Sequence, residues 1–298
     1  MAPKNQQLLL ELAYDLCSSQ KRFGNWDAFT LRPGGSSLWT TASALTALGK
    51  AELILKQKPI WLLRCTRRGW KYLEETANMK PIGFNELTPC DADSTCWMAH
   101  AIVYRIANIA HISDSSESEW LLKWLHICIN YLVSHVDQKR NGVRTYIAED
   151  GIMEYINRQG HSSSWLDVHN CVTANVQALG RNLKLFLPEV APEHSELFCN
   201  FRLGGSPFWW TSPEIMNYLN DTSLCDKRVP RSDPWTLRIP FHDDFTGNCS
   251  VYSDKVDVEG GLCEDSGGFS TVLSILACAN SFKLLFRSGM ASEILNTK

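Results

Sequence analysis

Five segments of this 298-residue chain share one pattern, in which glycine, serine or aspartate precedes serine or threonine and then a nearly all-apolar run. They read GGSSLWTTASALTAL, DADSTCWMAHAI, DVHNCVTANVQAL, GSPFWWTSPEIMNYL and EDSGGFSTVLSILA, and they start near residues 36, 92, 168, 206 and 267. Small polar residues favour N-capping, and a helix that is apolar all round is typical of a buried helix. The pattern therefore predicts repeated buried helices, each with a small polar cap at its start.

Amphipathic segments separate these apolar runs and predict a second, outer set of helices. Residues 59–77 and the run WLLKWLHICINYLVSHV carry charged residues on one face, and residues 5–20 also have apolar positions at helical spacing. The starts recur at near-multiples of 40–60 residues, the size of a helical hairpin repeat, with a longer gap that has room for a degenerate sixth. Six hairpins of about 50 residues would use the whole chain.

This repeat predicts an all-α fold, an α/α barrel that forms a single domain over residues 1–298. No long strand alternation appears, although a short hairpin within 137–156 is compatible with the sequence. In such a ring every inner helix starts at the same end. The loops that precede the inner helices, including DADST, are therefore expected to converge on one mouth.

The segment TPCDADSTCW places two carboxylates, Asp91 and Asp93, at the start of the second apolar helix. Two interpretations remain open from the residues alone. Asp and Ser cap helices, and acidic side chains suit the positive end of the helix dipole. Alternatively, the pair forms a functional site at the mouth of the barrel.

Charge, hydropathy and cysteine content argue against several classes of protein. A net charge of −3 gives no footprint for nucleic acid, and the basic cluster around Trp70 is interpreted as a solvated helix face. No secretory leader and no apolar run of about 18 residues is apparent. Eleven scattered cysteines without a CxxC pair argue against a zinc knuckle and a disulfide framework. We expect a cytoplasmic protein with no transmembrane segment.

Together, the helix-start pattern and DADSTCW resemble the prenyltransferase/squalene-oxidase repeat superfamily, and within it the class II terpene cyclases, whose signature is Asp-x-Asp-Asp or Asp-x-Asp-Thr/Ser. The resemblance covers most of the chain and implies a six-hairpin α/α barrel. It also implies that Asp93 is the general acid that protonates an alkene, with Asp91 as its neighbour. Ser94 stands where squalene cyclases have a further Asp. Most members of the superfamily are longer and carry a second barrel.

The implied reaction is protonation-initiated cyclisation of a prenyl chain, either a prenyl diphosphate or a prenylated small molecule. Burial and a nearby carboxylate raise the pKa of a carboxyl, whereas a helix N-terminus lowers it, so the sign for Asp93 is left open. Aromatic side chains stabilise carbocations through cation–π contact. The substrate-binding candidates at or near inner-helix starts are Trp39, Trp97, Trp165, Trp209 and Trp210, to which Asn175, an amide in an apolar helix, is added.

A metal-dependent, ionisation-initiated mechanism is not expected, because Asp243-Asp244 lacks the third Asp of the magnesium-binding pattern in ionising terpene synthases. Protonation itself requires no cofactor, although Mg²⁺ would help to bind a diphosphate substrate. The expected partner is a small isoprenoid molecule, and the oligomeric state is left open. Two alternatives remain: an α/α-barrel enzyme that uses mouth carboxylates on a polar substrate, and a non-catalytic barrel that binds a lipid or a protein.

Overall fold

The computed structural model describes residues 3–28, 30–31, 34–55, 57–109, 115–152 and 166–201, together with 236–238, 262–264, 271–272, 275–276 and 279. The fold is all-α, an α/α barrel built from helical hairpins. The long helices are α1 (Pro3–Ser18), α2 (Ser37–Ile54), α3 (Ile60–Ala77), α4 (Ala92–Ile109), α5 (Ser115–Ser134), α7 (Asn170–Phe186) and α8 (Pro192–Cys199).

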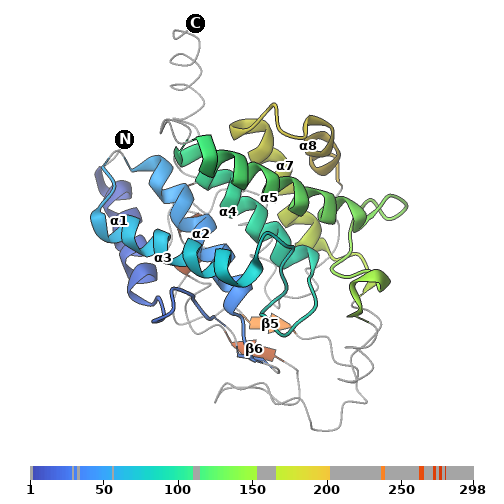
Figure 1. The fold of residues 1–298 in the computed structure, drawn as a ribbon, viewed down its shortest axis with the longest axis horizontal. Coiled ribbons are helices and arrows are strands. Elements are labelled where there is room, and N and C mark those ends of the chain that lie inside the picture. The colour runs from blue at the N-terminus through green and yellow to red at the C-terminus, as the bar shows by residue number, and fades with distance from the viewer. Residues whose placement is uncertain are drawn as a thin grey trace, which may run out of the picture.

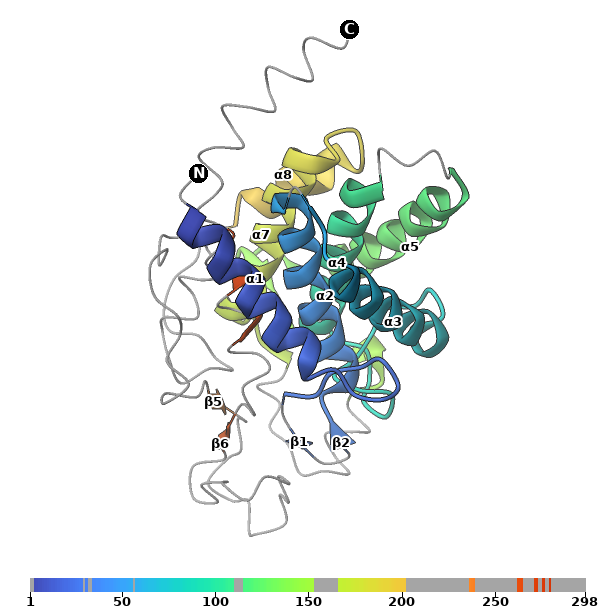
Figure 2. The same cartoon turned by 90° about the vertical axis from the view of Figure 1, so that its left-hand side faces the viewer.

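Three of these helices form the inner layer of the described chain. α2 packs against α4, and α4 packs against α7, while α3, α5 and α8 each pack against the inner helix that precedes them. Figures 1 and 2 show the three hairpins following one another in chain order, with α1 lying beside α2 and α3. The alternation of inner and outer helices predicted from the repeat is therefore present across residues 37–199.

Burial separates the two layers as their sequences predict. Every described residue of α2 is buried except Lys50 and Leu53, in keeping with its apolar, small-residue sequence. In α3, Leu62, Trp70 and Leu73 face the core, whereas the arginines and Lys71 are exposed. One apolar face and one charged face are typical of an outer helix.

Small residues allow the inner helices to approach one another closely. A Cβ on Gly49 of α2 would lie 3.0 Å from the Tyr104 Cβ of α4. Asn108 of α4 fixes the same crossing, because its Nδ2 donates to the Gly49 carbonyl at 2.8 Å. The two helices are thus held by backbone-directed hydrogen bonding as well as by apolar packing.

The described strands form three short antiparallel pairs: β1 (Thr30–Leu31) with β2 (Gly34–Gly35), β3 (Val136–Asp137) with β4 (Gly142–Val143), and β5 (Thr236–Arg238) with β6 (Leu262–Glu264). The hairpin expected within 137–156 is correct in kind but lies earlier, at 136–143. Residues 148–150, inside the expected stretch, form a 3-10 turn instead.

The expected serine cap of α2 is wrong. Ser36 occupies the N-cap position without a side-chain capping bond. Its hydroxyl instead accepts the Ala28 N–H at 3.0 Å and shares a 2.6 Å bond with Thr40. Ser36 therefore anchors the preceding loop, and the first turn of α2 is bonded to the loop before α4, because the Trp39 N–H donates to the Phe84 carbonyl at 3.3 Å.

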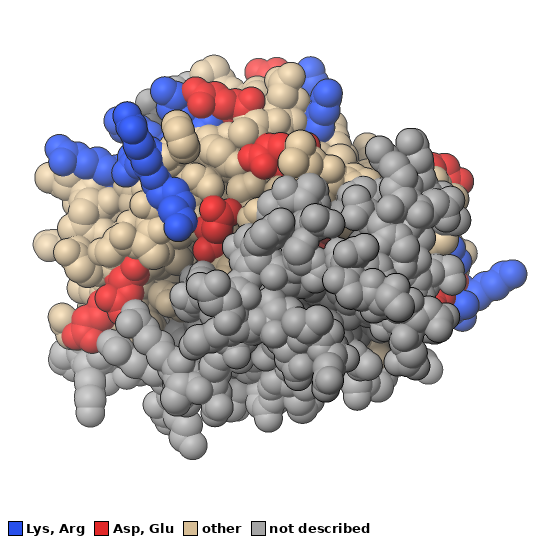
Figure 3. Space-filling view, turned by 90° about the horizontal axis from the view of Figure 1, so that it is seen from below, with Lys and Arg blue, Asp and Glu red and all other residues tan. Residues whose placement is uncertain are grey.

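Charges of both signs are interspersed over the described surface in the view from below (Figure 3). No continuous basic patch is visible among the described residues on that face. Of the helices in the described part of the chain, none is both long and apolar enough to traverse a lipid bilayer.

Candidate active site

Asp91 caps helix α4. Its Oδ1 accepts the backbone N–H of Ser94 at 2.7 Å, and its Oδ2 accepts the Ser94 hydroxyl at 2.6 Å. The Asp91 carbonyl accepts the first helical hydrogen bond, from Thr95. These contacts satisfy donors that a helix start leaves free. The capping interpretation of the sequence therefore describes the contacts of Asp91.

Asp93 lies two residues further on, and its contacts are entirely different. Its Oδ2 accepts the indole N–H of Trp39 at 2.9 Å, and its Oδ1 accepts the Asn175 Nδ2–H at 3.1 Å. The three residues come from α2, α4 and α7, and Asn175 lies 82 positions from Asp93 in sequence. The starts of three inner helices therefore meet at one carboxyl, as the expectation of a common mouth requires.

The environment of Asp93 raises its pKa. Removal from water by the surrounding protein is the largest cause, and the hydrogen bonds from Trp39 and Asn175 oppose it. Asp93 is less completely buried than Asp91, which is 4% exposed. The sign left open by the sequence is thus resolved towards the protonated form.

Burial also raises the pKa of Asp91, to about 8, against the opposing effect of the Ser94 hydrogen bonds. The charges of Asp93 and Asp150 contribute smaller parts of this rise in the Asp91 pKa. From the sequence, a neighbouring carboxylate was expected to raise the pKa of Asp93, the proposed proton donor. In the structure this effect acts on Asp91, whereas the pKa of Asp93 is raised by burial.

Aromatic rings surround the Trp39 contact. Trp39 and Trp97 meet edge to face with centroids 6.3 Å apart, and Phe84 lies 6.1 Å from Trp39. Trp39 and Trp97 are each 3% exposed, so both rings are packed in the interior of the described part of the chain. Trp165, Trp209 and Trp210 lie outside the described residues, as do His242, Asp243 and Asp244.

Two polar residues near this site were missed by the sequence interpretation. His100 lies on α4 seven residues after Asp93, and Asn182 lies on α7 seven residues after Asn175. Both are buried, and Asn182 contacts His100 directly. The available signal was a polar residue recurring after two helical turns within an apolar segment.

A loop with a buried histidine–carboxylate contact supports the start of α4 from the other side. The Thr145 carbonyl accepts the Ala92 N–H at 2.9 Å, and the Thr145 hydroxyl contacts His169 Nδ1. Five residues further on, Asp150 contacts His135 Nε2 at 2.9 Å, with both side chains buried. No sequence motif indicates these contacts.

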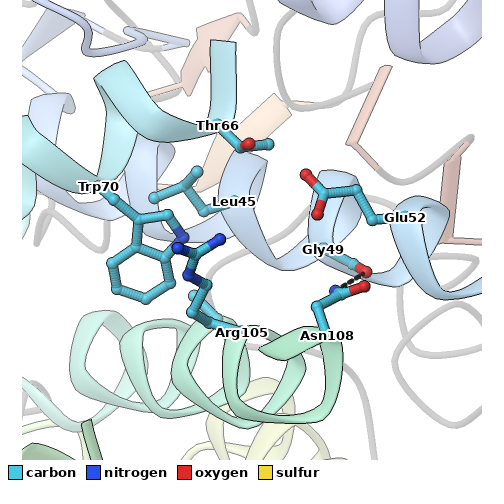
Figure 4. Close-up of a pocket in the computed structure, with 8 residues that line it drawn as sticks. Leu45, Gly49, Glu52, Thr66, Trp70, Arg105 and Asn108 are labelled. Atoms are coloured by element: carbon cyan, nitrogen blue, oxygen red, sulfur yellow. Dashed lines mark hydrogen bonds between the residues drawn. The ribbon is translucent and has the colours of Figure 1, made fainter. Parts of the chain in front are cut away.

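A small pocket lies further along α4, between α2, α3 and α4 (Figure 4). It encloses about 10 Å³, room for about one water molecule. Its lining includes Glu52, Arg105 and Asn108, and Glu52 Oε1 has no hydrogen-bond partner among the described residues. Arg105 is twelve residues from Asp93, so this pocket is separate from the carboxyl site.

Within the described part of the chain, no group of three or more histidine, cysteine or acidic side chains is arranged to hold a metal ion. No family model matches the chain, and no curated protein matches it.

Solved structures do match, and they define the fold as that of the type II terpene cyclases. One of these structures is MstE from Scytonema in its apo form, which is 15% identical with a TM-score of 0.59. The match covers 95% of this chain and 99% of the MstE chain. A variant of MstE in complex with geranylgeranyl dihydroxybenzoate, its substrate, has a TM-score of 0.55 at 16% identity, with 93% and 97% covered.

A protein from Actinoplanes is also similar, with 22% identity and a TM-score of 0.52. The match covers 72% of this chain and spans 59% of the Actinoplanes protein. At these identities the likeness establishes the fold.

Proposed function

We propose that this chain is a class II terpene cyclase-like enzyme that protonates the terminal alkene of a prenyl chain, with Asp93 as the general acid. The observation that carries the proposal is the environment of the Asp93 carboxyl. Burial favours its protonated form, while two neutral N–H donors, from Trp39 and Asn175, are directed at its two oxygens.

This arrangement suits proton transfer from a carboxylic acid to an alkene carbon. In the reaction, the Asp93 O–H bond breaks and a C–H bond forms at the alkene carbon, which leaves a tertiary carbocation and a carboxylate. Donors that already point at the developing carboxylate stabilise it without reorganisation. The N-terminal end of α4, where Asp93 lies, also favours the negative charge.

Ring closure follows when further double bonds attack the carbocation. Aromatic faces stabilise such cations. The described rings proposed for this role are Trp39, which donates to Asp93, and Trp97, which meets Trp39 edge to face. Loss of a proton or internal capture by a nucleophile ends the reaction. Asp93 then regains a proton before the next turnover.

The substrate class we favour is a prenylated small molecule, ahead of a prenyl diphosphate. The support is the similarity to MstE, whose substrate is geranylgeranyl dihydroxybenzoate. Trp165, Trp209 and Trp210 remain proposed contributors to the same binding site, with Asn175 holding the acid. Asp91 is proposed to assist as the neighbouring carboxyl that fixes the helix start.

The test is turnover by the full chain. Wild type, Asp93→Asn and the exposed control Asp167→Asn are incubated with geranylgeranyl dihydroxybenzoate, farnesyl diphosphate and geranylgeranyl diphosphate, and products are identified by mass spectrometry. We expect a cyclic product from wild type and the control and none from Asp93→Asn, which has the same shape but no acidic proton. A wild type that cyclises none of these substrates, or an Asp93→Asn variant that still does, rules out the proposal.

A further inference from the structure

Four polar side chains form a ladder between α4 and α7. Asp93 and His100 are seven residues apart on α4, and Asn175 and Asn182 are seven residues apart on α7. Seven residues make about two helical turns, so each pair faces in one direction. His100, Asn175 and Asn182 are all buried. Polar groups in such a position are costly unless each is hydrogen-bonded.

Asn175 is bonded on both sides. Its side-chain Nδ2–H donates to Asp93 Oδ1, and its backbone carbonyl contacts His100 Nε2 at 3.1 Å. The residue that holds the acid is therefore itself held by a second residue of the acid's own helix.

The tautomer of His100 follows from its other contact. Asn182 Nδ2, a donor, lies 3.0 Å from His100 Nδ1. Nδ1 must therefore accept, which leaves the ring proton on Nε2, where it donates to the Asn175 carbonyl. One orientation of a neutral imidazole satisfies both neighbours.

The surroundings keep this imidazole neutral. The pKa of His100 is lowered to about 4, mainly by burial and in smaller part by the positive charges of Lys50 on α2 and Arg181 on α7. Its other ring contact, with Trp97, has centroids 5.9 Å apart. The Nδ1 lone pair is thus available to Asn182 at neutral pH.

We propose that His100 is a positioning residue for the Asp93 acid, acting through Asn175, and that Asn182 fixes the imidazole tautomer that this requires. For its effect on turnover, the inference rests on the function proposed above. His100 does not contact Asp93. It locks the α7 backbone at Asn175, so that the amide N–H stays directed at Oδ1. Misplacement of a catalytic group by about 1 Å is sufficient to cost about 100-fold in rate.

The test follows the protonation of Asp93 directly. Infrared spectra of the full chain carrying ¹³C-labelled aspartate report the carboxyl band that Asp93→Asn removes. In His100→Phe, which keeps a ring but no nitrogen, we expect this band to persist to higher pH than in wild type. The cause is loss of the Asn175 donor, which favours the carboxylate. His100→Gln, which retains a donor and an acceptor, should restore much of the wild-type titration.

A double variant shows whether His100 acts through Asn175. Asn175→Leu alone should shift the band at least as far as His100→Phe, and adding His100→Phe to it should shift the band no further. His126→Phe, at an exposed histidine of α5, is the matched control and should change nothing. Thermal melts show whether each variant is folded. If His100→Phe does not fold, Asn182→Leu supplies a second perturbation of His100 that leaves Asp93 and Asn175 intact.

Turnover supplies the second readout. His100→Phe should lower kcat by roughly 10- to 100-fold with little change in KM, because the acid rather than the binding surface is affected. An unchanged infrared titration, or full additivity with Asn175→Leu, overturns the positioning role. Absence of cyclisation by wild type, with the infrared shift present, would instead reject the proposed reaction and leave the positioning role standing.

Discussion

The two N–H donors on Asp93 and its burial have opposite effects on its pKa. The donors stabilise the carboxylate, whereas burial stabilises the protonated acid. Trp39→Phe removes one donor and should raise the pKa of Asp93 further. The acid form is the active one, so activity is present below the folded pKa and is lost as pH rises through it. The alkaline limb of the kcat profile should therefore move to higher pH.

The same variant should lower the maximum kcat by roughly 10- to 100-fold, since a donor to the developing carboxylate is lost. The measurement is kcat against pH for wild type, Trp39→Phe and the control Trp61→Phe. Trp61 lies on the outer helix α3, where it meets Tyr14 edge to face. An alkaline limb that moves to lower pH in Trp39→Phe would show that Trp39 does not act on this carboxyl as the geometry implies.

Asp91 tests whether the neighbouring carboxyl acts mainly through the helix start. Asp91→Ala removes both contacts with Ser94 and should lower the free energy of unfolding by about 1–2 kcal/mol. Asp91→Asn keeps a capping oxygen and should cost less than half of that. Urea denaturation measures both. Equal losses for Ala and Asn would refute the capping assignment, and turnover of the stable Asn variant then reports what the acidic group adds.

Helix crossings depend on small residues at a few contact points. Gly180 of α7 faces α8, and a Cβ there would lie 2.9 Å from the Ser195 carbonyl and 2.8 Å from the Phe198 Cβ. Alanine in a helix interior normally gains up to about 1 kcal/mol over glycine. Backbone cannot yield as a flexible side chain does, so the overlap should exceed this gain.

Gly180→Ala should therefore lower the free energy of unfolding by about 1–2 kcal/mol in chemical denaturation. Leu185→Ala, at a half-exposed site on the same helix, is the control and should change stability by about 0.5 kcal/mol or less. A stabilised Gly180→Ala protein would mean that α8 moves away from α7 more readily than its packing indicates.

Helix positions were predictable because the relevant signal is local. The expected starts near 36, 92 and 168 correspond to α2, α4 and α7, which begin at Ser37, Ala92 and Asn170. Those near 206 and 267 lie outside the described residues. The partners of Asp93 are different in kind: Trp39 and Asn175 lie 54 and 82 residues away. Pairing over such distances is set by packing, which periodicity does not encode.

The pKa of Asp93 was unpredictable for a related reason. Its sign depends on how completely the assembled helices exclude water, against two hydrogen bonds whose donors come from different hairpins. Asn175 was recognisable because an amide interrupts an apolar helix. For His100, the two-turn spacing from Asp93 marks a polar residue on the same helix face but does not indicate its partners on α7.

At the scale of the whole molecule, the proposed acid chemistry predicts how turnover responds to removal of metal ions. If the substrate is a prenylated small molecule, EDTA should leave turnover unchanged, because Asp93 supplies the proton. If a prenyl diphosphate is also converted, EDTA should weaken its binding and raise KM, since Mg²⁺ would screen the diphosphate charge. Product formation with and without EDTA, followed by Mg²⁺ addition, measures this. Equal inhibition with both substrates would indicate a metal in the protonation step.

The two-turn spacing shared by α4 and α7 has a consequence for how this protein can diverge. Each residue of an α-helix advances the chain by about 100° around its axis. Inserting or deleting one residue between Asp93 and His100, or between Asn175 and Asn182, would therefore rotate one member of each pair out of the helix–helix contact. Length within these two eight-residue windows is fixed more tightly than the identity of most side chains in them.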